Sequence, residues 1–117
     1  MTGDVRVRVT DTHDAVVVSV RGRIFYGTHE PLVDALTPLA EGARPRIVVD
    51  LVDVPMCDST GLNILVQTKL RAAARGGWLR LAAPQPIVRR VLEVTRLVRM
   101  LPIYDTVVDA VADETSG

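Results

Sequence analysis

One stretch in the middle of the chain restricts the fold more than any other, because it joins a buried strand to a helix through a short connection. The run from Ile47 to Leu51 is almost wholly apolar, which predicts a strand in the interior of a sheet. The sequence Asp58-Ser59-Thr60-Gly61-Leu62 then begins a helical pattern. Aspartate is a preferred N-cap residue, so Ser59 is expected in the first helical position. There the backbone N–H groups lack partners and the helix dipole is positive, and such a position tolerates a phosphate.

Strand and helix patterns alternate along the rest of the chain. Val5, Val7 and Val9 alternate with polar residues, and residues 15–20 are mostly β-branched, so the two segments predict a hairpin. Further along, the spacing predicts a helix from His29 that ends before Gly42, a strand over residues 46–51, a helix over 59–75, a strand over 78–82, a helix that starts near Pro86, a weak strand over 100–104 and a short helix over 107–112.

This order, β-β-α-β-α-β-α-β-α, predicts an α/β domain with a mixed, mostly parallel sheet of about five strands and about four helices. The length of 117 residues fits one domain over residues 1–117, with its core over about 4–112. The helical spacing also predicts which side chains face the sheet. In the second helix these are Leu62, Leu65, Val66, Leu70 and Ala73, and in the third Ile87, Val88, Val91 and Leu92.

Composition excludes several classes of protein. The 14 basic and 14 acidic side chains cancel, which argues against binding to nucleic acid or an anionic membrane. No apolar run approaches the roughly 20 residues of a membrane span, and the first residues do not resemble a signal peptide. The single cysteine, Cys57, excludes an intramolecular disulfide and fits a reducing compartment. We therefore expect a cytoplasmic protein without membrane insertion.

Nothing in the sequence forms a catalytic or metal-binding constellation. His13 and His29 have no Cys, Asp or Glu at ligand spacing, and no nucleophile elbow or nucleotide-binding glycine motif is present. Cys57 is expected to be a buried small hydrophobe, although exposure near a helix N-terminus would make its thiol reactive. We therefore expect no enzyme activity, no cofactor and no metal.

Gly61 leaves two interpretations of the helix start open. Glycine inside a helix costs about 1 kcal/mol relative to alanine, so its presence indicates close approach by another part of the chain or by a partner. Capping explains Asp58 but not Gly61. From spacing alone, a capped helix start with an unmodified serine and a phosphorylation site at Ser59 are both open.

The residues around this helix start resemble a known family. The run Ile47-Val48-Val49-Asp50-Leu51, then Val54, then Asp58-Ser59-Thr60-Gly61-Leu62, is similar to the signature of STAS domains, and specifically of the small bacterial anti-sigma factor antagonists. The resemblance continues through Gly76-Gly77, the segment from Pro86 to Glu93, and Ile103-Tyr104-Asp105. It covers nearly the whole chain in the element order given above.

The resemblance implies an anti-anti-sigma factor that works by partner switching. In that family the serine after the motif aspartate, here Ser59, is phosphorylated by the anti-sigma factor, a serine kinase that itself binds ATP. The unmodified antagonist binds the anti-sigma factor, the phosphorylated form releases it, and a metal-dependent serine phosphatase restores the serine. The resemblance thus implies a phosphoprotein that regulates transcription through protein binding, as a monomer or weak dimer.

Partner-binding residues are carried over from the same resemblance, namely Asp58, Ser59, Thr60, Gly61, Asn63, Phe25 and Tyr26. The family has acidic residues where this chain has Arg23 and Phe25, so Phe25 and Tyr26 are either core plugs or an apolar contact patch. The alternative function is a STAS accessory subunit that docks on a transporter ATPase without being phosphorylated. The arginines at positions 89, 90, 96 and 99 form either a solvated face or a contact for an acidic partner.

Overall fold

The fold confirms the predicted order of strands and helices. A computed structural model of the chain describes residues 5–114, so the predicted domain ends at residues 1–4 and 115–117 lie outside the described range. The elements are β1 (Arg6–Asp11), β2 (Val16–Arg21), α1 (Glu30–Ala40), β3 (Arg46–Asp53), α2 (Ser59–Ala74), β4 (Trp78–Ala82), α3 (Pro86–Val94), a 3₁₀ turn η1 (Leu97–Arg99), β5 (Ile103–Tyr104) and α4 (Val107–Ala112).

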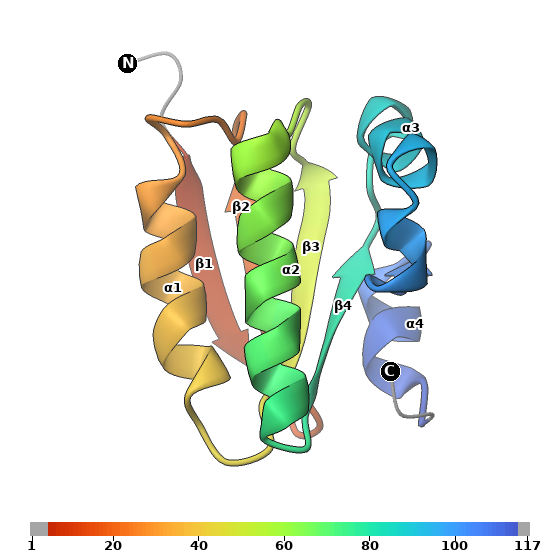
Figure 1. Cartoon of the computed structure of the whole chain (residues 1–117). Helices are drawn as coiled ribbons and strands as arrows, with labels where there is room; N and C mark the ends of the chain where they lie inside the picture. Colours follow the sequence, from red (N-terminus) through yellow and green to blue (C-terminus); the bar gives the residue numbers. More distant parts are fainter. Residues whose placement is uncertain (1–4, 115–117) are drawn as a thin grey trace.

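The five strands form one mixed sheet in the order β1-β2-β3-β4-β5. β1 and β2 pair antiparallel as the predicted hairpin, and the remaining neighbours pair in parallel. β3 is the central strand, and its residues from Ile47 to Val49 are buried. Because the parallel strands run in the same direction, the chain leaves β2, β3 and β4 at the same end of the sheet (Figure 1).

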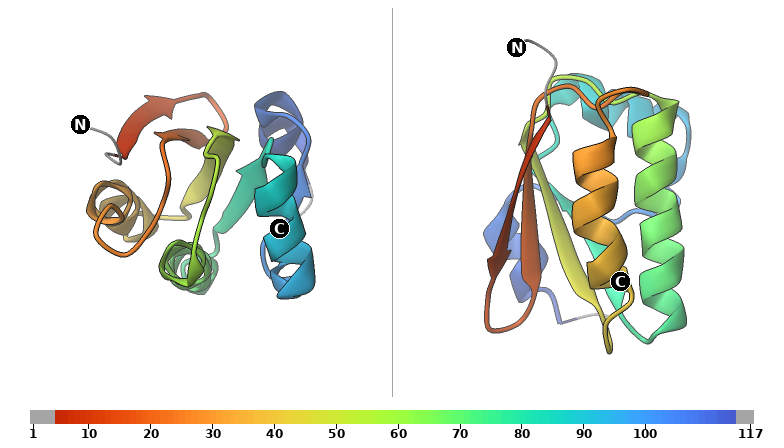
Figure 2. Two further views of the ribbon diagram at one scale, coloured as in Figure 1. Left: turned by 90° about the horizontal axis from the view of Figure 1, so that it is seen from above. Right: turned by 90° about the vertical axis from the view of Figure 1, so that its left-hand side faces the viewer.

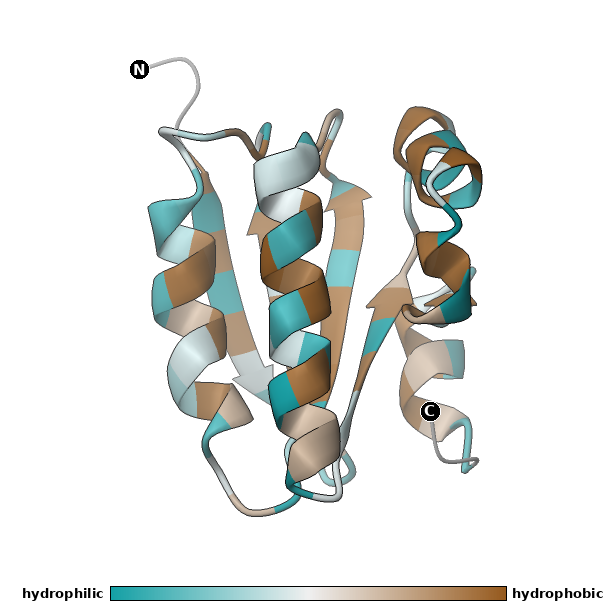
Figure 3. Cartoon of the chain, in the orientation of Figure 1, coloured by the Kyte–Doolittle hydropathy of each residue, from teal (hydrophilic) through white to brown (hydrophobic). Residues whose placement is uncertain are grey.

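Helices cover the two faces of the sheet unequally. α1 and α2 lie on one face, as the views from above and from the side show (Figure 2). Their buried side chains share one apolar cluster with Val18, Val49 and Leu81 of the sheet. α4 lies on the opposite face over β3, β4 and β5, where Ala110 packs against Val48. The central strands are accordingly hydrophobic over most of their length, whereas β1 alternates between hydrophilic and hydrophobic residues (Figure 3).

Two of the predicted inward faces are partly wrong. In α2, Leu70 and Ala73 are exposed, and the buried positions of that turn are Thr68 and Ala72. Thr68 can be buried because its hydroxyl donates a hydrogen bond of 2.7 Å to the Ile64 carbonyl one turn earlier. The inward face therefore follows helical phase rather than side-chain hydrophobicity.

The third helix and the segment after it also differ from the prediction. Val88 and Leu92 of α3 are buried as predicted, but Ile87 in the first turn is exposed. The predicted strand over residues 100–104 is shorter in the structure, since η1 occupies the chain before it and β5 keeps only two residues. Arg96 precedes η1 with φ of +63°, a left-handed conformation that turns the chain after α3.

Candidate functional site

The candidate site lies at the end of the sheet where β2 and β3 finish. The loop after β2 runs beside the loop after β3 and is tied to it by backbone hydrogen bonds. Gly22 N–H donates to the Asp53 carbonyl, Ile24 N–H to the Met56 carbonyl and Asp58 N–H to the Ile24 carbonyl, each at 3.0 Å. The two loops therefore hold the start of α2 in a fixed position at this end of the sheet.

Asp58 is the N-cap of α2, as predicted from its residue type. Its Oδ1 accepts a hydrogen bond of 3.1 Å from the Gly61 N–H, which satisfies one unpaired donor of the first turn. Its Oδ2 accepts a second bond of 3.2 Å from the Tyr26 N–H, 32 residues away in the sequence. One carboxylate thus fixes both the helix start and the neighbouring loop.

Gly61 is buried because the first turn of α2 lies directly against other parts of the site. A Cβ at this position would be 2.4 Å from the Cys57 Sγ and 2.7 Å from the Ile24 Cγ2, which is closer than atoms can approach. The close approach predicted from this glycine is therefore internal. Gly61 thus supports the surface from beneath, and its contact with a partner stays a prediction.

Ser59 occupies the first helical position, and its side chain is exposed. Thr60 is half-buried, and Asn63 is exposed one turn further along, on the same side of the helix as Ser59. Within residues 5–114, the backbone N–H groups of Ser59 and Thr60 have no hydrogen-bond acceptor. An exposed hydroxyl beside free N–H donors is accessible to a modifying enzyme, and the same donors favour negative charge.

The loop after β2 adds an aromatic side chain beside the helix start. Phe25 is half-buried, whereas Tyr26 is 81% exposed and stacks on His29 with ring centroids 5.5 Å apart. Thr28 holds the turn, since its hydroxyl accepts from the Phe25 N–H and donates to the Arg23 carbonyl. Of the two aromatic residues, Tyr26 therefore offers the larger contact surface. We call Tyr26, Ser59, Thr60 and Asn63 together the Ser59 surface.

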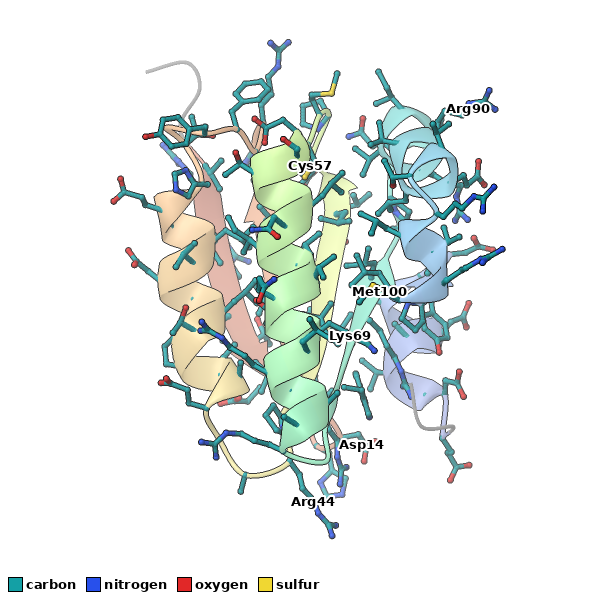
Figure 4. All side chains as sticks on the ribbon, in the orientation of Figure 1. Asp14, Arg44, Cys57, Lys69, Arg90 and Met100 are labelled. Carbon is teal, nitrogen blue, oxygen red and sulfur yellow. The ribbon has the colours of Figure 1, made fainter. Side chains whose placement is uncertain are left out.

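Cys57 lies under the first turn of α2 and is only 3% exposed (Figure 4). Burial, and to a smaller extent the negative charge of the neighbouring Asp58 carboxylate, together raise the pKa of its thiol from 9.0 to about 12. Cys57 is therefore a neutral packing residue. The sequence predicts a reactive thiol only if Cys57 is exposed, and it is buried. The effect of burial on the thiol pKa is larger here than the opposite effect of the helix dipole.

The described residues offer little for chemistry of the chain's own. No histidine side chain in residues 5–114 forms a hydrogen bond with Ser59, and His29 Nδ1 instead accepts from the Gly27 N–H. In the same range, no three His, Cys, Asp or Glu side chains lie in an arrangement that could hold a metal ion. No helix of this part of the chain is long and apolar enough to cross a membrane. Within the described residues, the Ser59 hydroxyl is thus exposed and has no hydrogen bond to a histidine.

The arginines near α3 do not join the Ser59 surface. Arg89 forms an ion pair of 3.1 Å with Asp105, in which the Arg89 side chain is half-buried and the Asp105 side chain is exposed. Arg90, Arg96 and Arg99 are exposed around the end of α3. One member of the predicted group is thus paired within the chain, and the exposure of the others fits both a solvated face and a contact for an acidic partner.

Comparison with known proteins identifies the family. The family model of the STAS domain matches residues 5–110, nearly the whole described range. The chain belongs to the STAS domain family. The predicted resemblance and the predicted fold class are both confirmed by this match.

Several relatives are named as anti-sigma factor antagonists. The anti-sigma-B factor antagonist of Bacillus subtilis is 33% identical over 101 residues, covering 86% of this chain and 91% of the relative. A crystal structure of an anti-sigma factor antagonist from Mycobacterium paratuberculosis superposes with a TM-score of 0.85 at 30% identity, covering 97% and 100% of the two chains. The phosphorylated form of the Bacillus cell fate determinant SpoIIAA, at TM-score 0.70 and 18% identity over 90% of this chain and 96% of that one, shares the fold.

Other matches cover less of the relative. A Thermotoga neapolitana protein named as an anti-sigma factor antagonist homologue is 36% identical over 72 residues, which are 62% of this chain and 63% of that protein. A Thermotoga maritima protein matches over 60% of its length. The chain thus spans less than two thirds of these two relatives.

Sequence reasoning missed Thr28 and His29 as supports of the Ser59 surface. Both act through the turn after Phe25, and the only signal was the cluster of turn-forming residues from Gly27 to His29. It also missed the fully buried Arg80, whose guanidinium Nη1 donates to the carbonyls of Ala110 and Asp113. Arg80 lies on the α4 side of the sheet and holds that helix rather than the Ser59 surface.

Proposed function

We propose that this protein is an anti-sigma factor antagonist whose binding to an anti-sigma factor is controlled by phosphorylation of Ser59. The observation that carries the proposal is the exposed Ser59 hydroxyl in the first turn of α2, on a helix start fixed by Asp58 and by the packing under Gly61. The names of the relatives support the same assignment.

The Ser59 surface is suited to a partner that packs closely on it. Tyr26 supplies exposed aromatic area, of the kind enriched in interface cores, and Asn63 supplies hydrogen-bonding groups. The partner class we propose is an anti-sigma factor with serine kinase activity, which brings its own ATP and transfers the phosphoryl group to the Ser59 oxygen. The antagonist itself contributes no catalytic residue. Because sigma factors act in the cytoplasm, we expect this interaction to take place there.

A phosphate on Ser59 should change binding far more than folding. It adds about −1.5 to −2 charges beside the Asp58 carboxylate. In the free protein, the N–H groups of Ser59 and Thr60 and the helix dipole stabilise this negative charge by about 0.3–1 kcal/mol. In a closed interface the same charge must lose its water, which costs several kcal/mol unless it is paired. The phosphorylated form is therefore released, and a serine phosphatase restores binding.

The test is phosphoryl transfer followed by intact mass. The purified protein is incubated with ATP and with each histidine-kinase-like ATPase encoded in the same genome, and its mass is recorded over time. We expect a gain of one phosphate with at least one kinase, no gain for Ser59→Ala, and a normal gain for the control Thr10→Ala, whose exposed hydroxyl lies on β1 outside the Ser59 surface. The variants are first compared with wild type by circular dichroism.

Two outcomes would overturn the proposal. Phosphate that still accumulates on Ser59→Ala would place the modification elsewhere. No gain with any of the kinases, together with co-purification of the protein with a transport ATPase, would favour the alternative function of an unphosphorylated accessory subunit.

A further inference from the structure

β1 is an open edge of the sheet. In the strand order β1 is outermost, and β2 is its only strand partner in the described part of the chain. The two views of Figure 2 show β1 at the margin of the molecule. An unpaired edge carries backbone N–H and C=O groups that can pair with an extended segment of another protein.

The side chains of β1 make this edge positively charged. Arg6 and Arg8 are exposed and point to the outer face of the sheet, the face that α4 covers over β3–β5. In the register, Arg6 lies opposite Arg21 and Arg8 opposite Ser19. A hollow of about 500 Å³ lies over these residues. Two arginines directly opposite each other destabilise a strand pair, so this pair does not contribute to the stability of the sheet.

The carboxylates near this hollow lie further from the edge. Asp50 and Asp53 belong to β3, on the far side of β2, where Asp50 pairs in register with Ser19 and Asp53 with Arg21. Asp50 Oδ1 already accepts from the Val52 N–H. None of Arg6, Arg8 and Arg21 forms an ion pair within residues 5–114. Arg6 and Arg8 are therefore the outermost charges of this hollow, and no carboxylate in the described part of the chain lies within ion-pair distance of them.

We propose that the β1 edge binds an extended acidic segment of a partner protein as an additional strand. Arg6 and Arg8 are two residues apart on one face, so carboxylates at positions i and i+2 of an added strand would lie opposite them. The residue between those carboxylates would face the other side of the sheet, where Val9 is 47% exposed. The preferred partner segment therefore alternates acidic and apolar residues. This surface is separate from the Ser59 surface and does not depend on phosphorylation.

A second copy of the chain fits this edge poorly. The sequence of β1 is Arg-Val-Arg-Val-Thr-Asp, so antiparallel pairing of two β1 strands centred on Val7 or Arg8 would set arginines opposite each other. Pairing centred on Val9 would set Arg8 opposite Thr10, which leaves both arginines without an opposite charge. Charge complementarity instead favours a partner of the opposite sign. A small anion would use the arginines but not the backbone of the edge, and this difference separates the two occupants in an experiment.

The test uses the full-length labelled protein and a blocked hexapeptide of alternating glutamate and valine. By NMR we expect the peptide to shift the amides of residues 6–11 and to slow their hydrogen exchange. The double variant Arg6→Glu, Arg8→Glu should bind at least tenfold more weakly, and a peptide of alternating lysine and valine should bind this variant instead. Arg90→Glu, on α3 and remote from β1 (Figure 4), is the control and should bind as wild type does. Arg8→Gln serves as a milder second variant and should weaken binding in the same direction.

Several results would overturn the inference. These are no binding of the glutamate–valine peptide, equal binding by the charge-reversed variant, and equal binding of a peptide with the same residues grouped into a glutamate block and a valine block. Shifts of the same amides by inorganic phosphate without slowed exchange would identify a small-anion site. A dimer of the wild-type protein in light scattering, with slowed exchange of the amides of residues 6–11 in the absence of peptide, would identify a second copy as the occupant.

Discussion

At the residue scale, the Ser59 surface depends on two residues beneath the first turn of α2. Gly61 leaves room for the side chains of Cys57 and Ile24, and Cys57 fills the space next to the helix start. Neither residue reaches solvent to a useful extent. Both act by fixing the height and direction of the turn that presents Ser59, which explains why an unfavourable helix residue is found there.

Gly61→Ala should destabilise the protein by about 1–3 kcal/mol, because the added Cβ must push against the Cys57 Sγ and the Ile24 Cγ2. Urea unfolding measures the change. Gly42→Ala is the matched control, since its nearest neighbour would be the Leu39 carbonyl oxygen at 3.4 Å, and it should change stability by less than about 0.5 kcal/mol. Adding Cys57→Ala to Gly61→Ala should recover part of the loss. A neutral Gly61→Ala would contradict the packing described here.

The thiol of Cys57 gives stability a dependence on alkaline pH. Its pKa is about 12 in the folded protein against the ordinary 9.0 of the unfolded chain. Below pH 9 the thiol keeps its proton in both states, so stability does not change with pH through this group. Above pH 9 the unfolded state loses the proton while the folded state retains it. The free energy of unfolding should therefore fall by about 1.4 kcal/mol per pH unit as pH rises from 9 towards 12.

The difference between wild type and Cys57→Ala isolates this effect from other groups that titrate in the same range. Denaturant unfolding at several values between pH 8 and pH 10.5 provides the data. We expect the two stability curves to run parallel up to pH 9 and to converge above it. Curves that stay parallel throughout would show that Cys57 keeps its ordinary pKa.

At the scale of the elements, α4 is held to the sheet by a buried charge. Arg80 of β4 donates hydrogen bonds of 2.8 and 2.7 Å to the carbonyls of Ala110 and Asp113 at the end of α4. Its guanidinium lies 3.7 Å from the centre of the Trp78 ring and 5.5 Å from the centre of the Tyr104 ring. The Tyr104 hydroxyl in turn donates to the Asp113 carboxylate. A six-residue helix is thereby fixed on the outer face.

Arg80→Met should lower the free energy of unfolding by about 2 kcal/mol, because two helix-end carbonyls lose a charged donor. The loss should be local to α4 first, so hydrogen exchange of the amides of residues 107–112 should quicken more than that of α2. The control is Arg90→Met on the exposed side of α3, which should change stability by less than about 0.5 kcal/mol. Equal exchange in both variants would refute the role assigned to Arg80.

The sequence predicted the features that depend on neighbouring residues, but not those that depend on contacts between distant segments. Asp58 as a cap and Ser59 in the first turn were predictable, since residue type and position in the helix settle both. The bond from the Tyr26 N–H to Asp58 was not, because the two residues meet only through the pairing of the loops. Leu70 was predicted on the inward face of α2, where the structure instead has Thr68, since hydrophobicity alone does not show that a hydroxyl is satisfied within the helix.

At the scale of the whole molecule, one end, one face and one edge of the sheet carry different structural features. The strand ends and α2 present the Ser59 surface, the outer face carries α4 over β3–β5, and the β1 edge carries Arg6 and Arg8. Because the Asp58 hydrogen bonds and the packing under Gly61 hold the helix start, we do not expect a phosphate on Ser59 to change the conformation of the loops or of α2. We therefore expect phosphorylation to weaken partner binding through its charge at the interface, without changing the fold.

The most direct test of this claim is the affinity of one anti-sigma factor for three forms of the protein, measured by calorimetry. The forms are unmodified, phosphorylated on Ser59, and Ser59→Ala, each checked by NMR for an unchanged fold. We predict that the phosphorylated form binds about 100-fold or more weakly than the unmodified form, about 2.7 kcal/mol, and that Ser59→Ala binds within a few-fold of it. Equal affinities of the phosphorylated and unmodified forms would contradict the account.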